Sequence, residues 1–358
     1  MQTEAVCAYL FLVALRLLWR VWPNPGSMRE IVEQYRIIAA GAGWSERADR
    51  GRLRVAGRDG VEFLQALLTN DVGALRPGAG LYAAYLTPQG RMLADLFLYH
   101  CGDYLLLDVV DSQAAPLVQR LDGLIFTEDV RVSDASSEIA QVTVFGQTAP
   151  AVLAHAFSVE PLNPERLALL PLRNHVEVGG VRIARTDEID LPVFDVFLAP
   201  AELQTVTVRL NEMGAVHTSP ALLDALRIEA GRPVYGRDMD TETIPLEAGL
   251  LDRAISTSKG CYVGQEIVVR ILHRGGGRVA KRLVKLLFDE DSSVPAAGTS
   301  IRRDGRDVGR VTSAALSPRT ERVVALGYVH RDHSELGTRL SIGPETGESN
   351  AEITALAG

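Results

Sequence analysis

Residues 259–266 read Lys-Gly-Cys-Tyr-Val-Gly-Gln-Glu, and they place one thiol, Cys261, between a lysine and a predicted helix start at Gly264. A neighbouring cation and the partial positive charge of a helix N-terminus each lower the pKa of a thiol. Cys261 is therefore a candidate nucleophile, redox-active group or transient metal ligand. The alternative is that Cys261 is a small buried hydrophobic residue, flanked by glycines that let the backbone turn.

The composition is that of an ordinary multidomain globular protein. The chain has 358 residues, enough for roughly two or three domains. Its formal net charge of −8 argues against a stable nucleic-acid complex, because coating phosphates needs a surplus of Lys and Arg. The 3 cysteines are too few and too scattered for a disulfide framework or a zinc site, so we predict a reducing, cytoplasmic environment and no metal site.

The N-terminal segment carries a short apolar run, residues 5–15, followed by Arg16 and Arg20. A membrane span needs about 20 apolar residues, so no membrane span is predicted. No positive charge precedes the run and no clear cleavage site follows it, which disfavours a secretory signal. We interpret residues 1–27 as an upstream extension, with Met28 as the natural start, and keep a weak membrane anchor as the alternative.

Hydrophobic periodicity and turn residues predict an α+β protein, because strands and helices mix without the regular alternation of a doubly wound sheet. The predicted strands of the first two thirds are 52–55, 81–86, 91–100, 104–110, 141–145 and 176–185. The predicted helices are 60–68, 113–126 and 222–230, with an irregular connector at 161–171. From residue 281 onward, β segments at 283–287, 299–301, 308–312 and 322–329 predict a small all-β domain.

Five stretches together carry a family resemblance: residues 63–72, 85–92, 227–233, 244–247 and 259–270. They resemble the folate-binding YgfZ-type proteins, relatives of the glycine-cleavage aminomethyltransferase, over about residues 28 to 355. The resemblance implies two interleaved α+β domains within 28–275 and a C-terminal β-barrel within 280–358. It also implies that tetrahydrofolate binds in the central opening.

The same resemblance suggests site residues. Aminomethyltransferases have two consecutive aspartates where this chain has Ala94 and Asp95, and an arginine where it has Leu223. Asp195 matches the acidic position that reads the pteridine N–H donors. The working thiol would be Cys261, and the expected cofactor-binding residues are Asp95, Asp195, Arg227, Lys259, Gln265 and Glu266.

Arg227 and Glu229 lie two apart on a predicted helix, so they should face different sides. For this pair we leave open a structural reading, in which one residue forms ion pairs and the other is solvated. The basic stretch 270–285 has two readings, a cradle for the folate glutamate tail or an RNA phosphate, and a solvated hinge.

Three functions follow from the resemblance. The leading one is a folate-dependent accessory protein for iron–sulfur cluster assembly or repair, with iron–sulfur client proteins and a family link to tRNA modification. The second is a tetrahydrofolate-dependent aminomethyltransferase, which the missing aspartate disfavours. The third is a folate-binding module in which Cys261 is inert.

Overall fold

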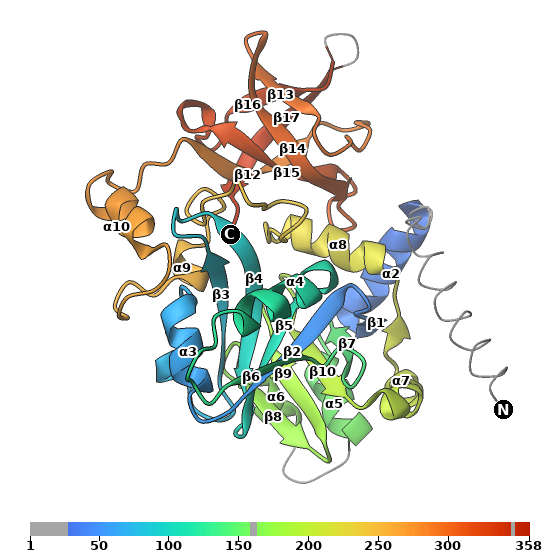
Figure 1. Ribbon diagram of the computed structural model, residues 1–358. Coiled ribbons are helices and arrows are strands. Elements are labelled where there is room, and N and C mark those ends of the chain that lie inside the picture. Colours follow the sequence, from blue (N-terminus) through green and yellow to red (C-terminus); the bar gives the residue numbers. More distant parts are fainter. Residues whose placement is uncertain (1–27, 158–162, 345–347) are drawn as a thin grey trace, which may run out of the picture.

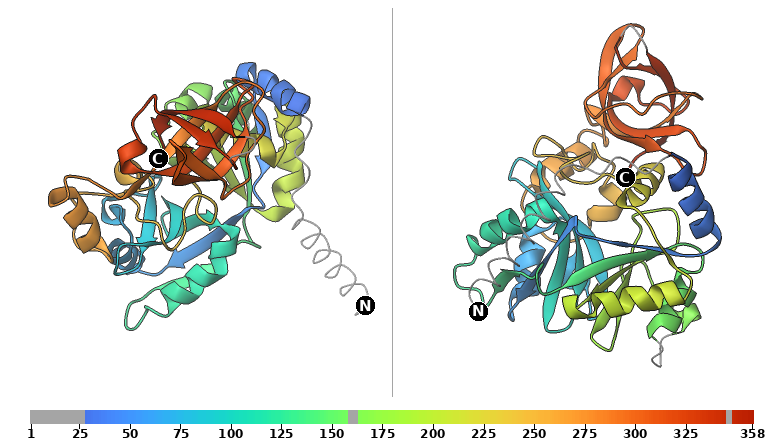
Figure 2. Two further views of the ribbon diagram at one scale, coloured as in Figure 1. Left: turned by 90° about the horizontal axis from the view of Figure 1, so that it is seen from above. Right: turned by 90° about the vertical axis from the view of Figure 1, so that its right-hand side faces the viewer.

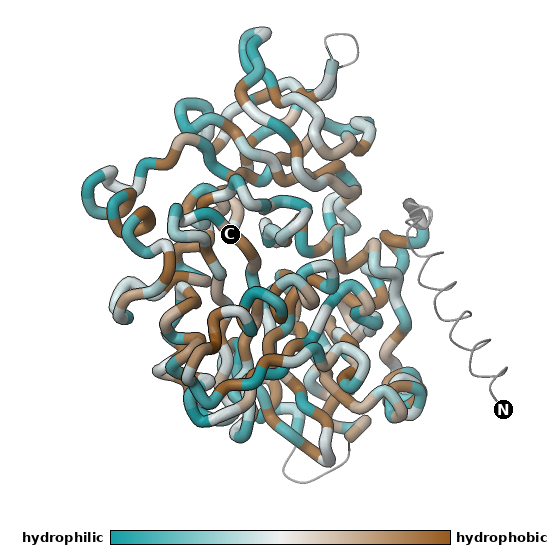
Figure 3. The backbone as a smooth tube through the Cα atoms, in the orientation of Figure 1, coloured by the Kyte–Doolittle hydropathy of each residue, from teal (hydrophilic) through white to brown (hydrophobic). Residues whose placement is uncertain are grey.

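The computed structural model describes residues 28–157, 163–344 and 348–358. The predicted extension, residues 1–27, lies outside them. Figure 1 shows a β-barrel standing on a larger α+β region, and Figure 2 shows the same arrangement from two other sides. In Figure 3 the hydrophobic stretches follow the strands, while the outer loops are mainly hydrophilic.

The first sheet has six strands in the order β11-β1-β7-β10-β9-β8, and its pairs are antiparallel except the parallel pair of β1 and β11. Its strands are β1 Gly43–Glu46, β7 Ala140–Phe145, β8 His175–Val178, β9 Val181–Arg185, β10 Val193–Leu198 and β11 Val216–His217. Helices α5 (Ala149–Phe157), α6 (Pro164–Ala168) and α7 (Leu203–Glu212) pack on one face. That face is apolar because alternate strand residues point toward the helices.

The second sheet has five antiparallel strands in the order β3-β4-β5-β2-β6. Its strands are β2 Arg50–Ala56, β3 Gly80–Leu86, β4 Met92–His100, β5 Tyr104–Val110 and β6 Arg131–Asp134. Helices α3 (Gly60–Leu67) and α4 (Asp111–Asp122) bury their apolar stripes on its outer face. A short η1 turn, Val72–Ala74, follows α3.

The two α+β units are interleaved along the chain, as predicted. The chain begins the first sheet with β1, crosses to build the whole second sheet from β2 to β6, and returns with β7. The inner faces of the two sheets meet through Tyr99 of β4 and Phe197 of β10, whose ring centroids are 5.5 Å apart. A polar layer lies between the sheets beside these rings.

The C-terminal domain is a closed barrel in the strand order β12-β15-β14-β13-β16-β17. Its strands are β12 Lys281–Phe288, β13 Ser300–Arg303, β14 Arg306–Leu316, β15 Val323–His330, β16 Arg339–Ile342 and β17 Ser349–Leu356. The α+β region meets it through α8 (Pro220–Glu229), because Ile228 packs with Leu283 and Leu326 of the barrel. The remaining elements are α2 Met28–Ala40, η2 Pro200–Glu202, α9 Leu251–Ala254, α10 Gln265–His273 and η3 Arg331–His333.

The structure corrects three sequence predictions. The single strand predicted at 176–185 is two strands, because Gly179 and Gly180 have φ of 57° and 81° and form a turn. The connector predicted at 161–171 contains α6, whose Asn163 side chain accepts a hydrogen bond from the Arg166 amide, while residues 161 and 162 lie outside the described residues. The helix predicted to reach Phe126 ends at Asp122, and Phe126 is 83% exposed.

Candidate functional site between the two sheets

Strand alternation brings the two predicted aspartates into one layer. In β4, Ala94 and Leu96 point into the core under α3 and α4, so Asp95 points to the opposite, inner face. In β10, Phe194 and Val196 point into the other helix-covered core, which turns Asp195 inward as well. Both carboxylates therefore lie in the layer between the sheets.

Asp195 is fully buried, and only one of its carboxylate oxygens is satisfied. Thr143 on β7 donates a hydrogen bond to Oδ1 at 2.5 Å, while Oδ2 has no partner within the described residues. Burial and the negative charge of Glu188 raise the pKa of Asp195 to about 7. Asp195 is thus a carboxyl group that can gain or lose its proton near neutral pH.

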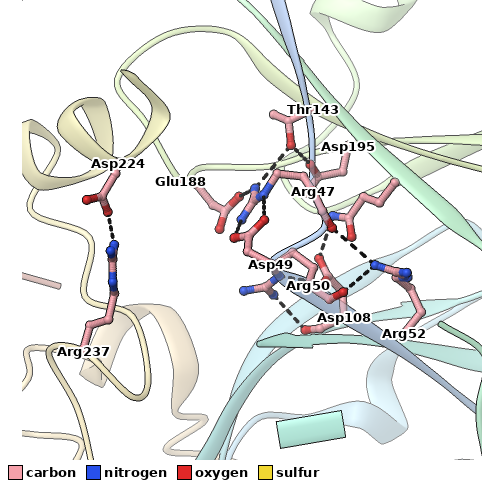
Figure 4. Close-up of polar contacts among 11 residues, drawn as sticks. Arg47, Asp49, Arg50, Arg52, Asp108, Thr143, Glu188, Asp195, Asp224 and Arg237 are labelled. Carbon is pink, nitrogen blue, oxygen red and sulfur yellow. Dashed lines mark hydrogen bonds and ion pairs between the residues drawn. The ribbon is translucent and has the colours of Figure 1, made fainter. Parts of the chain in front are cut away.

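Arg47, in the crossover from β1 to β2, is a cation whose charge acts on Asp195 and opposes the rise in its pKa. Its guanidinium pairs with Glu188 at 2.9 Å and with Asp49 at 2.9 Å, and it donates to the Thr143 hydroxyl at 3.3 Å (Figure 4). Burial opposes the charge of Glu188, but the ion pair with Arg47 lowers the pKa of that carboxyl. Neither Arg47 nor Glu188 was predicted as a site residue, since neither lies in a motif or an apolar pattern.

A second ion pair, between Arg50 and Asp108, lies buried in the same layer. Arg50 on β2 donates to Asp108 on β5 at 2.7 Å (Figure 4). Gln141 on β7 donates to the other carboxylate oxygen of Asp108 at 3.1 Å. Arg50 and Asp108 are both buried. Arg50 and Asp108 belong to neighbouring strands of the second sheet, so the hydrogen bond from Gln141 is what connects this pair to the first sheet.

Asp95 is the second carboxylate with an unused oxygen. The Tyr82 hydroxyl donates to Oδ2 at 2.6 Å, and Oδ1 is buried with no partner in the described part of the chain. Burial raises the pKa of Asp95. The Tyr82 ring is covered by the Arg253 guanidinium, whose carbon lies 4.9 Å from the ring centroid.

The layer therefore offers two unused carboxylate oxygens beside aromatic rings. Buried polar groups without partners are uncommon in folded proteins and need a reason such as a missing ligand. The complementary ligand is a flat heteroaromatic molecule with N–H donors on its edge. A tetrahydrofolate pteridine has this donor set, so the residues present fit the cofactor that the sequence resemblance implies.

Lys259 was also expected to bind the cofactor, but its side chain contacts main-chain oxygens at the end of α3. Its ammonium donates to the main-chain oxygens of Gln65, Leu68 and Asn70 at 2.7, 2.6 and 2.9 Å, and lies 5.1 Å from the Tyr262 ring centroid. Burial lowers the pKa of Lys259 to about 8. Lys259 thus ties the motif to the C-terminal end of α3.

The other motif residues lie at the start of α10. Cys261 is exposed, Gln265 is half-buried and Glu266 is exposed. Gly264 has a φ of 84°, and a Cβ atom there would stand 2.6 Å from the Thr87 oxygen, so the turn into α10 requires glycine. The helix start predicted at Gly264 is confirmed, while the roles of Cys261, Gln265 and Glu266 stay predictions.

Arg227 and Glu229 are both buried, so the reading in which one of them is solvated is wrong. Arg227 pairs with Asp238 at 2.6 Å and Asp224 at 2.7 Å and donates to Ser313 of the barrel at 2.9 Å. Glu229 accepts a hydrogen bond from the Ser317 hydroxyl of the barrel. The barrel packs against the C-terminal end of α8 and buries both residues. This contact between domains cannot be recognised from the residues of α8 alone.

Two kinds of feature, a metal-binding group and a membrane-spanning helix, are absent from the described ranges, residues 28–157, 163–344 and 348–358. No group of three or more His, Cys, Asp or Glu side chains that could hold a metal ion is present there. No helix in these ranges is long and apolar enough to cross a membrane.

Comparison with known families agrees with this architecture. A family model described as the GCVT N-terminal domain matches residues 20–259, and one described as the glycine cleavage T-protein C-terminal barrel domain matches residues 281–357. The chain belongs to the glycine cleavage T-protein family. The matches establish this family, whereas the narrower YgfZ resemblance stays a prediction.

Individual T-protein relatives match along most of their length. The chain is 30% identical to the aminomethyltransferase of Geobacillus kaustophilus, covering 90% of this chain and 88% of that protein. It is 31% identical to the aminomethyltransferase of Rubrobacter xylanophilus, covering 86% and 81%. The glycine cleavage system aminomethyltransferase T from Bartonella henselae superposes with a TM-score of 0.81 at 22% identity, over 91% of this chain and 88% of that one, which shows a shared fold.

Proposed function

We propose that this T-protein family member binds tetrahydrofolate in the layer between its two sheets. Asp195 and Asp95 would accept hydrogen bonds from the N–H groups of the pteridine. The observation that carries this proposal is the pair of unpartnered buried oxygens, Oδ2 of Asp195 and Oδ1 of Asp95. When bound, the cofactor would supply a carrier for one-carbon units.

The function we favour is a folate-dependent accessory role in iron–sulfur cluster assembly or repair, with Cys261 as the working thiol. Its support is the Lys-Gly-Cys-Tyr-Val-Gly-Gln-Glu run and the exposure of Cys261 at the start of α10. A thiol must be accessible and reach its thiolate form to ligate a metal or to exchange electrons with a client protein.

Aminomethyl transfer is the second candidate, and a specific observation favours it. Relatives at 26 to 31% identity are named aminomethyltransferases. Asp95, hydrogen-bonded to Tyr82, is a buried carboxyl with a raised pKa that could hold a proton next to a folate amine. Ala94 lacks the neighbouring carboxylate, so this activity would depend on Asp95 alone.

The test of folate binding is calorimetric titration of tetrahydrofolate into wild type and Asp195→Asn. We expect the variant to bind about 10- to 100-fold more weakly, since it loses a charge-assisted acceptor. Asp129→Asn is the control, because Asp129 forms an exposed ion pair with Arg58 and should leave affinity unchanged. Equal affinity in wild type and Asp195→Asn would contradict this placement of the pteridine.

A second experiment distinguishes the two candidate functions. An aminomethyl-transfer assay on wild type and Asp95→Asn detects the enzyme, and complementation of a cluster-repair defect by Cys261→Ser tests the working thiol. Transfer that is lost in Asp95→Asn would make the protein an aminomethyltransferase. Full complementation by Cys261→Ser would reject the thiol role.

A further inference from the structure

Three arginines converge on one aspartate at the edge of the polar layer. Asp187 follows β9, and its Oδ2 accepts from Arg173 at 2.8 Å and from Arg253 on α9 at 3.0 Å. Arg232, which follows α8, donates to the Asp187 main-chain oxygen at 2.9 Å and to the main-chain oxygen of Gly358 at 2.6 Å. We call Arg173, Arg232, Arg253 and Asp187 the arginine cluster.

The side-chain charges of the arginine cluster do not balance. Two guanidinium groups, those of Arg173 and Arg253, bind the one carboxylate, whereas Arg232 binds main-chain oxygens. The next acidic groups are Glu188, which is paired with Arg47, and the exposed Asp190. Arg173, Arg253 and Asp187 are only 15%, 12% and 13% exposed. Burial and the positive charge of Arg253 lower the pKa of Arg232. A partly desolvated surplus of positive charge is costly unless an anion joins it.

Arg253 has hydrogen-bonding capacity to spare. It uses Nε for Asp187, and its two terminal nitrogens have no hydrogen-bond partner in the described part of the chain. Its guanidinium stacks on Tyr82, whose hydroxyl binds Asp95. Arg253 is therefore fixed at one edge against Tyr82, and its two terminal nitrogens form the fork that binds a carboxylate through two parallel bonds.

The backbone at Arg173 supports a functional reading. Arg173 has a φ of 65°, a left-handed conformation that is uncommon for a residue other than glycine. Its amide donates to the Arg185 oxygen at 2.8 Å, which holds the strained conformation and aims the side chain at Asp187. Such strain tends to persist where it orients a group for binding.

We propose that Arg253, oriented by Asp187 and Arg173, binds a carboxylate of the ligand that occupies the layer beside Tyr82 and Asp95. This inference rests on the proposed function. The carboxylate has two possible sources, the glutamate portion of tetrahydrofolate and a free amino acid that binds beside the pteridine. Each source places the same chemical group on the same guanidinium.

The experiment measures binding of three probes to wild type and Arg253→Met by calorimetry: tetrahydrofolate, 6-methyltetrahydropterin, which lacks the glutamate, and glycine. The matched control is Arg54→Met, because Arg54 also stacks on a tyrosine, 5.0 Å from the Tyr104 centroid, and pairs with a carboxylate, Glu138. Arg253→Lys keeps the positive charge but lacks the planar guanidinium. It serves as a second variant in case Arg253→Met fails to fold.

If the carboxylate belongs to folate, Arg253→Met weakens tetrahydrofolate binding about 10- to 100-fold and leaves pterin binding unchanged. If it belongs to an amino acid, only glycine binding is lost. Arg253→Lys should show a smaller loss on the same probe, and Arg54→Met none. Unchanged affinity of every probe in both Arg253 variants overturns the carboxylate site. Tetrahydrofolate binding to wild type in that case would leave the proposed folate function standing, whereas the absence of tetrahydrofolate binding would remove both.

Discussion

At the scale of single residues, the site depends on carboxyl groups whose pKa is raised by burial. Burial and the nearby negative charge of Glu188 raise the pKa of Asp195 to about 7. Asp95 and Tyr82 share one hydrogen bond in a similarly dry place. While no ligand is bound, these buried carboxyls reduce the stability of the fold. This is expected of residues in a preformed binding site and not of residues that only fill the core.

Asp195 should make the protein less stable as pH rises. An unfolded aspartate ionises near pH 4, whereas the folded-state pKa of Asp195 is about 7. Between these values the unfolded state loses the proton first, so folding stability falls as pH rises from about 4 to 7. Asp195→Asn should therefore gain stability relative to wild type across this window, by a few kcal/mol, and the difference should level off above it.

The measurement is urea denaturation of wild type and Asp195→Asn at several pH values. His175, whose pKa burial lowers to about 4, adds the opposite slope in the same window, but it is present in both proteins and cancels in the difference. A difference in unfolding free energy that does not change with pH would show that Asp195 ionises normally in the folded state.

At the scale of elements, the motif and α3 form one unit. The C-terminal end of a helix leaves carbonyl groups without partners. The Lys259 ammonium donates to the carbonyl of Gln65 in the last turn of α3, to that of Leu68 directly after the helix, and to that of Asn70 beyond it. Lysine near a helix C-terminus also interacts favourably with the helix dipole. The Lys-Gly-Cys sequence thus fixes the loop that carries Cys261 to a distant helix.

Lys259→Met should destabilise the protein by about 2–4 kcal/mol, because one buried and two partly buried carbonyls lose a charged donor. Urea denaturation measures this loss. The same variant should expose the loop, so amide exchange of residues 260–264 should quicken. Arg270→Met is the control, since Arg270 is exposed on α10, and it should change neither property. Unaltered stability of Lys259→Met would mean that the three hydrogen bonds contribute nothing net.

At the scale of the whole molecule, a buried charge network joins the barrel to the α+β region. Asp238 is fully buried and accepts from Arg227 of α8 at 2.6 Å and from the hydroxyls of Thr312 and Ser313 on β14 at 2.5 and 2.6 Å. Breaking such a pair leaves an uncompensated charge, which is far more costly than losing an exposed pair.

Asp238→Ala should lower the unfolding free energy by about 3–5 kcal/mol and let the barrel unfold separately. Differential scanning calorimetry should then show two transitions in place of one. The exposed pair of Arg58 and Asp129, whose side chains are 84% and 55% exposed, provides the control, and Asp129→Ala should cost less than about 1 kcal/mol. A single transition at the wild-type temperature would refute the coupling role of Asp238.

The sequence alone determined the α+β class, the β-rich tail and most strands. Alternation is a local property, so β4 could be recognised from its neighbours, and with it the inward side of Asp95. The strand β10 was not among the predicted strands, and Asp195 was singled out only through the family resemblance. Two barrel strands, β16 and β17, were not predicted, although each alternates: Leu340 and Ile342 in β16, and Ala351 and Ile353 in β17, are buried between more exposed polar residues.

Only the tertiary structure decided which residues share a site. The contacts that define it join positions far apart in the chain, such as Arg47 with Glu188, separated by 141 residues, and Lys259 with Gln65, separated by 194. No periodicity or motif encodes such pairs, because the energy of a buried ion pair depends on which faces meet and how dry they become. Local sequence determined which way each strand faces, and the meeting of the two sheets determined which charges stayed unpaired.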